Sequence, residues 1–196
     1  MTVTAIVLAA GQGSRFRAEA GADQDKLLAL CVGRDGVTRP VIEQVLVSLP
    51  QRVGKRWVVT SPDRVDVIRL AKAYGCEVLL LRSTGMGDSI AAAVAASATA
   101  QGWLVVLGDM PFIRSSSIER VIDGLEEGGI NVPLQDGRYG HPVAFGQALR
   151  PGLLALTGDH GARSVFAQAM VREVPIEDPG VHWDVDVPQS LSFTFD

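Results

Sequence analysis

Short apolar runs alternate with longer segments of helical periodicity along the first half of the chain. This alternation is typical of strands that are connected through helices into a mostly parallel sheet. The expected strands are residues 4–8, 56–60, 77–81 and 104–107. The expected helices between them are residues 40–49, 64–74 and 88–98. The pattern therefore predicts an α/β fold in which the carboxyl ends of the strands form a ligand-binding rim.

The second half of the chain is less regular, and its expected elements are shorter. They are a helix at 115–126, strands at 131–133 and 142–145, helices at 148–156 and 162–170, and strands at 172–174 and 183–187. A chain of 196 residues can bury one good core but is short for two ordinary domains. We therefore expect residues 1–196 to form a single domain.

The composition argues against several classes of protein. A net charge of -4 disfavours general binding to nucleic acid or to a membrane surface, since both usually need a basic face. No apolar run approaches the roughly 20 residues of a membrane span, and the first residues lack the basic region of a signal peptide. Cys31 and Cys76 lack the spacing of metal ligands, which favours buried, reduced thiols in a cytoplasmic protein.

A glycine-rich loop follows the first expected strand. In Val7-Leu-Ala-Ala-Gly-Gln-Gly-Ser-Arg-Phe16, the two glycines allow backbone amides to face a phosphate chain, while Arg15 and Lys26 supply positive charge. The segment lacks the third glycine and the following helix of a dinucleotide-binding motif, and the Gly-Lys-Ser/Thr of a Walker loop. For this motif alone, a nucleoside triphosphate site and an ordinary glycine turn with an incidental arginine both remain open.

Carboxylates in two segments are suited to a metal ion. Asp109 stands in Leu107-Gly-Asp-Met-Pro111, at the end of a strand, where it can bind Mg²⁺ together with nucleotide phosphates. Its alternative role is an Asx turn or a helix cap. In Trp183-Asp-Val-Asp-Val187, alternation places two carboxylates on one side of an extended segment, unless this is a solvated edge strand. We favour Asp186 over Asp184 as the second metal ligand.

Small and polar residues mark a third possible contact with the nucleotide. Thr60 ends a strand at the expected rim, and Gly85-Met-Gly-Asp-Ser89 precedes a helix. Gly87 and Ser89 can therefore contact a base, ribose or phosphate at a helix N-terminus. Capping of that helix by Asp88 or Ser89 is compatible with such a contact.

The second half contains two residues suited to an anionic substrate. His141 directly precedes an expected strand, although a lone histidine is more often structural than catalytic. Arg163 follows a loop at the start of a helix, which Asp159 would cap. The other two histidines, His160 and His182, are interpreted as bystanders.

Seven ordered blocks between Leu8 and Pro188 together resemble one family. They are Leu8-Ala-Ala-Gly-Gln-Gly-Ser-Arg-Phe16, Asp25-Lys26, Gly85-Met-Gly87 with Ser89, Gly108-Asp-Met-Pro111, Gly140-His-Pro-Val143, Gly158-Asp-x-Gly-Ala-Arg163 and Asp184-Val-Asp186-x-Pro188. The chain resembles the nucleotidyltransferases that mature the molybdenum cofactor, most closely the cytidylyltransferases. This resemblance implies a Rossmann-like nucleotidyltransferase fold of the glycosyltransferase A type, with a mixed, mostly parallel sheet flanked by helices in three layers.

The resemblance also implies a reaction, in which CTP and a molybdopterin-type cofactor give the cytosine dinucleotide form and pyrophosphate. Mg²⁺ would be the cofactor, and a molybdoenzyme or its maturation chaperone a partner. Residues 1–112 would bind the nucleotide and residues 113–196 the cofactor substrate. The implied roles are catalysis by Arg15, Lys26 and Asp109, metal binding by Asp109 and Asp186, and substrate binding by His141 and Arg163. The implied nucleotide contacts are Leu8, Ala9, Ala10, Gly11, Gly13, Ser14, Arg15, Lys26, Thr60, Gly87, Ser89 and Asp109.

The choice of base depends on Ala9-Ala10. Related guanylyltransferases usually carry Leu-Ala-Gly-Gly in the first block, so the alanine pair favours CTP over GTP. Two positions depart from the family pattern: Arg17 replaces a common glycine, which leaves the shape of the loop after Phe16 open, and Val187 replaces a frequent threonine. A different substrate therefore stays open. The alternatives are a guanylyltransferase, a sugar-phosphate nucleotidyltransferase and a non-catalytic nucleotide- or cofactor-binding carrier. A nicotinamide oxidoreductase is disfavoured, because Thr60-Ser-Pro62 stands where an acidic residue is needed.

Overall fold

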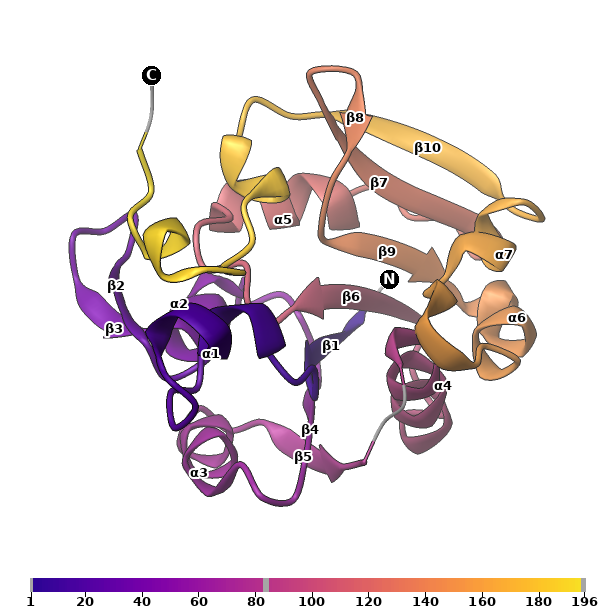
Figure 1. Ribbon diagram of the computed structural model, residues 1–196. Helices are drawn as coiled ribbons and strands as arrows, with labels where there is room; N and C mark the ends of the chain where they lie inside the picture. Colours follow the sequence, from indigo (N-terminus) through magenta and orange to yellow (C-terminus); the bar gives the residue numbers. More distant parts are fainter. Residues whose placement is uncertain (1, 83–84, 195–196) are drawn as a thin grey trace.

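The centre of the structure is a mixed sheet (Figure 1). The computed structural model describes residues 2–82 and 85–194, and within these residues the sheet has eight strands. Their order is β10-β7-β9-β6-β1-β4-β5, and β8 pairs with β7. The strands are β1 Thr4–Ala9, β4 Arg56–Thr60, β5 Glu77–Leu80, β6 Gly102–Leu107, β7 Gly129–Gln135, β8 Arg138–Tyr139, β9 Val143–Gly146 and β10 Met170–Pro175.

The strand β1 lies between β4 and β6 and is parallel to both. Its register places Leu8 opposite Leu107 and Ala9 opposite Thr60, so the ends of these three strands meet at one edge. Pairs β4–β5 and β7–β10 are also parallel, whereas β9 runs antiparallel to both β6 and β7. The sheet is therefore mixed and mostly parallel, as the sequence predicts.

Helices cover both faces of this sheet (Figure 1). One face packs against α2, α3 and α5 through a core that includes Val45, Val67 and Ile118. The other face packs against α4, α6 and α7 through Ile90, Leu153 and Val165. The expected three-layer, Rossmann-like architecture is confirmed. The helices are α1 Ser14–Ala20, α2 Val41–Ser48, α3 Val65–Ala73, α4 Met86–Ala96, α5 Ser115–Ile122, α6 Arg150–Leu154 and α7 Arg163–Phe166.

The apolar run of β1 explains its central position. Ala5 and Val7 contribute to one core and Ile6 to the other, and all three side chains are fully buried. Complete burial of a valine or isoleucine side chain stabilises a fold by roughly 1.5–3 kcal/mol, so a strand that is apolar on both sides is favoured in the interior. The strand therefore fixes the following loop firmly to the middle of the sheet edge.

The expected strands and helices of the first half all form, with small shifts at their ends. In the second half, the helix expected to end at 126 stops at Ile122, because Asp123 is extended with ψ 132°, and Gly124 after it is left-handed with φ 63°. The buried side chain of Asn131 then donates to the carbonyl groups of Val121 and Asp123, at 2.9 and 3.1 Å. The helix expected over 162–170 is shorter than predicted: it forms as α7, Arg163–Phe166, and Met170 already begins β10.

The strand expected over 183–187 is absent, and that prediction was wrong. The segment is irregular between short 3-10 helices at Pro179–His182 and Pro188–Leu191. A backbone hydrogen bond joins it to the rim instead, in which the Val185 N–H donates to the Asp109 carbonyl over 2.8 Å. This bond brings the carboxylates that flank Val185 to the rim of the sheet.

The sequence patterns missed three elements near the rim. Helix α1 begins directly after Gly13, although no helix was expected behind the glycine loop. The short strands β2 Leu30–Val32 and β3 Thr38–Pro40 form a separate antiparallel pair. Within residues 2–82 and 85–194, no helix has the length and apolar character needed to cross a membrane.

Candidate active site

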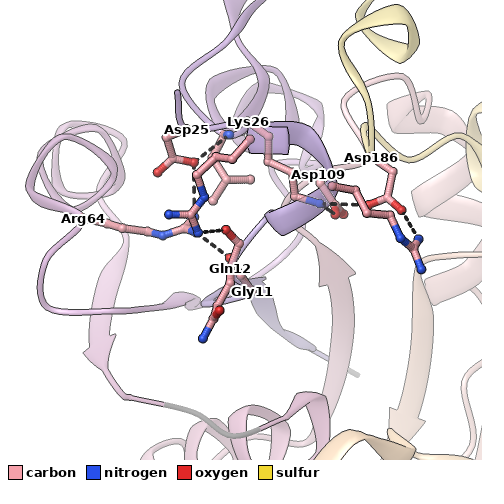
Figure 2. A network of polar contacts seen from close by, with 10 residues as sticks. Gly11, Gln12, Asp25, Lys26, Arg64, Asp109 and Asp186 are labelled. Atoms are coloured by element: carbon pink, nitrogen blue, oxygen red, sulfur yellow. Dashed lines mark hydrogen bonds and ion pairs between the residues drawn. The ribbon is translucent and has the colours of Figure 1, made fainter. Parts of the chain in front are cut away.

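A cluster of opposite charges lies at the carboxyl edge of the sheet (Figure 2). The buried ammonium group of Lys26 lies 2.5 Å from Oδ2 of Asp109 and 3.4 Å from Oδ1 of Asp186. Arg15, on α1, lies 2.5 Å from the other carboxylate oxygen of Asp186. Four residues that the sequence places far apart thus form one network.

Neighbouring charges set the pKa values of the two carboxylates around Val185. Burial alone would raise the pKa of Asp186, but hydrogen bonds and charge from Arg15 and Lys26 outweigh it and lower the pKa below its usual value. The pKa of Asp184 is raised, first by burial and then by the negative charges of Asp109 and Asp186. Asp186 is therefore the carboxylate better suited to remain ionised beside a cation.

A pocket of about 360 Å³ lies beside this network. Gly11 lines it without a left-handed backbone, and an added Cβ atom would meet nothing within 4 Å. The fold itself therefore does not require glycine there. The other lining residues are Leu8, Ala9, Ala10, Gln12, Lys26, Leu27, Gly85, Met86, Ser89, Leu107, Asp109 and Asp159.

Gly13 differs from Gly11, because its own conformation requires glycine. Its φ is 62°, and an added Cβ would lie 3.3 Å from Cγ of Lys26. The loop therefore packs against the side chain of Lys26, and α1 begins at the next residue, Ser14. Neither Gly13 nor Ser14 lines the pocket, and Arg15 reaches the network through Asp186.

Two of the expected nucleotide contacts have structural roles. Thr60 is fully buried, and its hydroxyl donates to the carbonyl group of Ala9 over 3.1 Å. Gly87 lies against the neighbouring loop, where an added Cβ would come within 2.9 Å of the Gly158 carbonyl oxygen. Neither residue lines the pocket. Both instead hold the backbone from which the lining residues project.

A second pocket, of about 560 Å³, adjoins the first, and Met86 and Asp159 line both. It contains His141 and Arg163, which the sequence predicts to contact the substrate. Much of its wall is apolar or aromatic, with Val132, Val143, Tyr139, Phe145 and Phe166 among the lining residues. The structure thus places two pockets side by side, one with Lys26 and Asp109 in its wall and one with several aromatic side chains in its wall.

The imidazole of His141 is uncharged at neutral pH. Burial lowers its pKa to about 4, against the opposing effect of the Asp109 carboxylate. Within the described residues, its Nδ1 atom is buried and has no hydrogen-bond partner. His182 lies outside both pockets, with Nε2 3.3 Å from the Arg138 carbonyl oxygen. The side chain of His160 lies outside the described part of the structure.

A family model described as the MobA-like NTP transferase domain matches residues 5–174. The chain belongs to the MobA-like NTP transferase family. The match includes β1, the glycine loop, Lys26, Asp109 and both pockets, and it ends before Asp186. Three members of the charge network, Arg15, Lys26 and Asp109, therefore lie within the matched domain.

Relatives among characterised proteins agree with this family. The Bifunctional protein GlmU of Cereibacter sphaeroides (strain ATCC 17025 / ATH 2.4.3) is 35% identical over 156 residues, which cover 76% of this chain and 33% of that protein. The chain thus spans about a third of the length of this relative. The similarity therefore covers only part of the longer protein.

Solved structures share the fold. A nucleotidyl transferase from Methanothermobacter thermautotroptrophicus has a TM-score of 0.80 and 21% identity, with 96% of this chain and 94% of that chain covered. Rv0371C from Mycobacterium tuberculosis H37Rv, solved with manganese, has a TM-score of 0.74 and 23% identity, covering 97% and 96%. Molybdopterin-guanine dinucleotide biosynthesis protein A from Archaeoglobus fulgidus has a TM-score of 0.66 and 18% identity, covering 96% and 95%.

The structure also reveals site residues that the sequence motifs did not identify. Asp159 was expected to cap α7, but Ala162 is the residue before that helix, and Asp159 lines both pockets. Asp88 was expected to cap α4, but Gly85 is at that position, and a carboxylate oxygen of Asp88 accepts the Gly158 N–H over 3.1 Å. Arg64 contacts the glycine loop, and no pattern in the sequence indicated this contact.

Proposed function

We propose that the protein transfers CMP from CTP to the phosphate of a molybdopterin-type cofactor, releasing pyrophosphate, with Mg²⁺ as the metal. The observation that carries the proposal is the pair of adjoining pockets. One has Lys26 and Asp109 in its wall, and the other joins it at Met86 and Asp159 and has an apolar, aromatic wall. A triphosphate and a ring-containing acceptor could then meet at the boundary.

The nucleotide half of the proposal rests on charge. Lys26 and Arg15 provide two cations for the phosphate chain. Asp109 and Asp186 already lie on either side of one ammonium group, so their oxygens can face a common cation. Within the described residues, no group of three or more His, Cys, Asp or Glu residues could hold a metal. Two carboxylates nevertheless fit Mg²⁺, which takes its other ligands from phosphate and water.

The proposed reaction needs positioning more than proton transfer. A phosphate monoester has a second pKa of about 6, so it is largely dianionic at neutral pH and can attack without a general base. Its oxygen forms a bond to the α-phosphorus of CTP, while the bond from that phosphorus to the bridging oxygen breaks and pyrophosphate leaves. Bound Mg²⁺ would supply charge neutralisation at the phosphates. Lys26 and Arg15 would orient the phosphate chain and add positive charge where the leaving group forms.

The acceptor half of the proposal rests on the second pocket. Its aromatic wall suits a fused ring system better than a hydrated sugar, because burial of apolar ring surface is favourable. Arg163 supplies a cation for the acceptor phosphate, and the neutral His141 supplies a polar contact without charge. The name of the Archaeoglobus fulgidus structure supports the same acceptor class, although it refers to a guanine product.

The choice of CTP rests on Ala9-Ala10. Ala9 is buried, and Ala10 lines the nucleotide pocket, where its methyl group narrows the space available to a base. A smaller pyrimidine suits such a pocket better than a purine. Exchange of Ala10 for glycine should therefore raise turnover with GTP relative to turnover with CTP.

Product analysis tests the proposed function. The protein would be incubated with Mg²⁺ and CTP or GTP, together with molybdopterin or a hexose 1-phosphate, and the products identified by mass spectrometry. We expect one new species, molybdopterin joined to CMP, and pyrophosphate in equal amount. A nucleotide-sugar product would favour the sugar-phosphate alternative. Tight nucleotide binding with no product from any combination would favour a carrier.

A further inference from the structure

The glycine loop separates two pockets that differ in their charged residues. Ala10 and Gln12 line both the nucleotide pocket and a polar pocket of about 490 Å³. Arg17 and Arg64 line only the polar pocket, whereas Lys26 and Asp109 line only the nucleotide pocket. Figure 2 shows Arg64 approaching Gly11 from one side, with Asp109 and Asp186 on the other. One side of the loop therefore faces two arginines, and the other side faces the lysine and the aspartate of the nucleotide pocket.

Two guanidinium groups hold consecutive carbonyl groups of this loop. Arg64, just before α3, donates from Nη2 to the Gly11 carbonyl oxygen. Arg17, on α1, donates from Nη2 to the Gln12 carbonyl oxygen. Both arginines line the polar pocket, so both carbonyl groups are drawn toward that side.

Peptide geometry determines where the next amide groups point. In a planar trans peptide, the C=O of one residue and the N–H of the next point in opposite directions. The N–H groups of Gln12 and Gly13 are therefore turned away from the arginines that hold the preceding carbonyl groups. Across residues 2–82 and 85–194, neither N–H donates to a protein acceptor. Successive amides without a protein acceptor can form an anion-binding concavity.

We propose that Arg64 and Arg17 are positioning residues for a triphosphate: by holding the Gly11 and Gln12 carbonyl groups, they aim the N–H groups of Gln12 and Gly13 at its phosphates. This inference rests on the proposed function, because it needs a triphosphate at the loop. It does not depend on the base or on the acceptor. Neither arginine touches the ligand in this arrangement.

Arg64 has a second contact that extends its effect to Lys26. Its side chain is only 10% exposed, and Nη1 lies 3.4 Å from Oδ1 of Asp25. The same oxygen accepts the Leu27 N–H over 3.0 Å. A single guanidinium group thus joins the glycine loop to the turn that presents Lys26. Its loss should disturb both the amide donors and the lysine, whereas loss of Arg17 should disturb only the loop.

The test compares Arg64→Gln and Arg17→Gln with Arg69→Gln. Arg69 lies on the exposed surface of α3, is paired only with Asp66 among the described residues, and makes no contact with the loop. The probes are CTP, cytidine and inorganic tripolyphosphate, with affinities measured by calorimetry. Thermal unfolding of each variant shows whether it is folded, and Arg17, being exposed, provides a variant whose folding should be intact.

We expect Arg64→Gln to weaken binding of CTP and tripolyphosphate roughly ten- to a hundredfold, as loss of hydrogen bonds to a charged group implies. Arg17→Gln should weaken both severalfold, and Arg69→Gln should change neither. Cytidine lacks phosphates, so its affinity should be the same in all four proteins. A residue with a merely structural role would instead weaken cytidine and CTP alike.

Backbone NMR supplies a direct signature of the amides. In the wild type, tripolyphosphate should shift the Gln12 and Gly13 amide proton resonances downfield, and Arg64→Gln should reduce these shifts. Unchanged affinity and unchanged shifts in both variants would overturn the positioning role and leave the proposed function intact. If the wild type bound neither tripolyphosphate nor any nucleoside triphosphate, both the inference and the proposed function would be overturned.

Discussion

The ammonium nitrogen of Lys26 lies 2.5 Å from a carboxylate oxygen of Asp109. A second carboxylate, that of Asp186, lies 3.4 Å from the same nitrogen. The lysine therefore offsets the mutual repulsion of two carboxylates, of which Asp186 is also paired with Arg15. In the proposed reaction, a metal ion would bind to the same oxygens while the ammonium turns to the phosphates. Lysine and metal then compete for one pair of carboxylates.

Replacement of Lys26 by methionine should separate its competition with the metal ion from its contribution to phosphate binding. We expect Lys26→Met to bind Mn²⁺ alone severalfold more tightly than the wild type, because no ammonium competes with it. Turnover should fall at least a hundredfold, because the phosphates lose a cation at the reaction centre. Electron paramagnetic resonance of free Mn²⁺ measures the affinity, and Lys72→Met, on the exposed side of α3, is the control. Weaker Mn²⁺ binding by Lys26→Met would contradict the competition.

Of the two proposed metal ligands, Asp109 should cause the larger loss of activity when it is replaced. Asp109→Asn should reduce pyrophosphate release at least a hundredfold, because a neutral amide neither balances Lys26 nor binds a divalent cation as well as a carboxylate. Asp66→Asn changes an exposed carboxylate on α3 and should leave the rate unchanged. Near-normal turnover by Asp109→Asn would remove the metal role assigned to it.

Replacement by alanine should affect stability differently at Gly11 and at Gly85. Gly11 has space for a Cβ atom and no left-handed backbone, so Gly11→Ala should leave stability unchanged or raise it by about 0.4–1 kcal/mol. The new methyl group would project into the nucleotide pocket, and CTP affinity should fall about tenfold.

In contrast, an alanine Cβ at Gly85 would lie 2.2 Å from the carbonyl carbon of Gly158, which a backbone contact cannot easily relieve. Gly85→Ala should therefore lower the unfolding free energy by about 1–3 kcal/mol. Urea unfolding and calorimetry measure both quantities. Loss of stability in Gly11→Ala with unchanged CTP affinity would make the loop an ordinary structural turn.

The buried imidazole of His141 should make stability depend on pH. Its folded-state pKa of about 4 lies below the ordinary value of 6.5, so between these values the unfolded chain binds more protons. The stability contributed by the neutral imidazole is thus present above pH 6.5 and is lost as the pH falls toward 4. Asp109 and His182 are the charged neighbours, with opposite effects.

Relative to His141→Gln, the wild type should lose about 2 kcal/mol of unfolding free energy between pH 7.5 and pH 5. Urea unfolding at both pH values measures this difference. Equal losses in the two proteins would mean that the imidazole titrates normally in the folded state.

Strong local patterns allowed much of the fold to be predicted from the sequence. The run from Thr4 to Ala9 is apolar on both sides, which restricts it to a central strand, and strand ends then place Ala10 and Asp109 on one rim. The segment around Asp186 lacked such a constraint. Its alternating residues suggested a strand, but the segment is joined to the rim by the hydrogen bond from Val185 to Asp109 and by the ion pairs of Asp186. Contacts of this kind depend on tertiary structure and leave no periodic signal.

The site residues likewise divide into those that a local sequence motif indicates and those that only tertiary contacts reveal. Motifs singled out Lys26, Asp109 and Asp186, and the structure brings these three charged side chains into one network. Arg64 was missed, since it stands in a turn with no motif and acts through the Gly11 carbonyl group. Thr60 was expected to contact a ligand on account of its position at the rim, yet its side chain is turned inward to Ala9. Strand-end position predicts proximity to a site but not side-chain direction.

The central claim is that this site transfers a cytidylyl group from CTP. The most direct measurement is initial pyrophosphate release with Mg²⁺, molybdopterin and each of the four nucleoside triphosphates in turn. We predict release with CTP that requires molybdopterin and is at least tenfold faster than with ATP, GTP or UTP. Equal or faster release with GTP, or no release with any of the four, would contradict the claim.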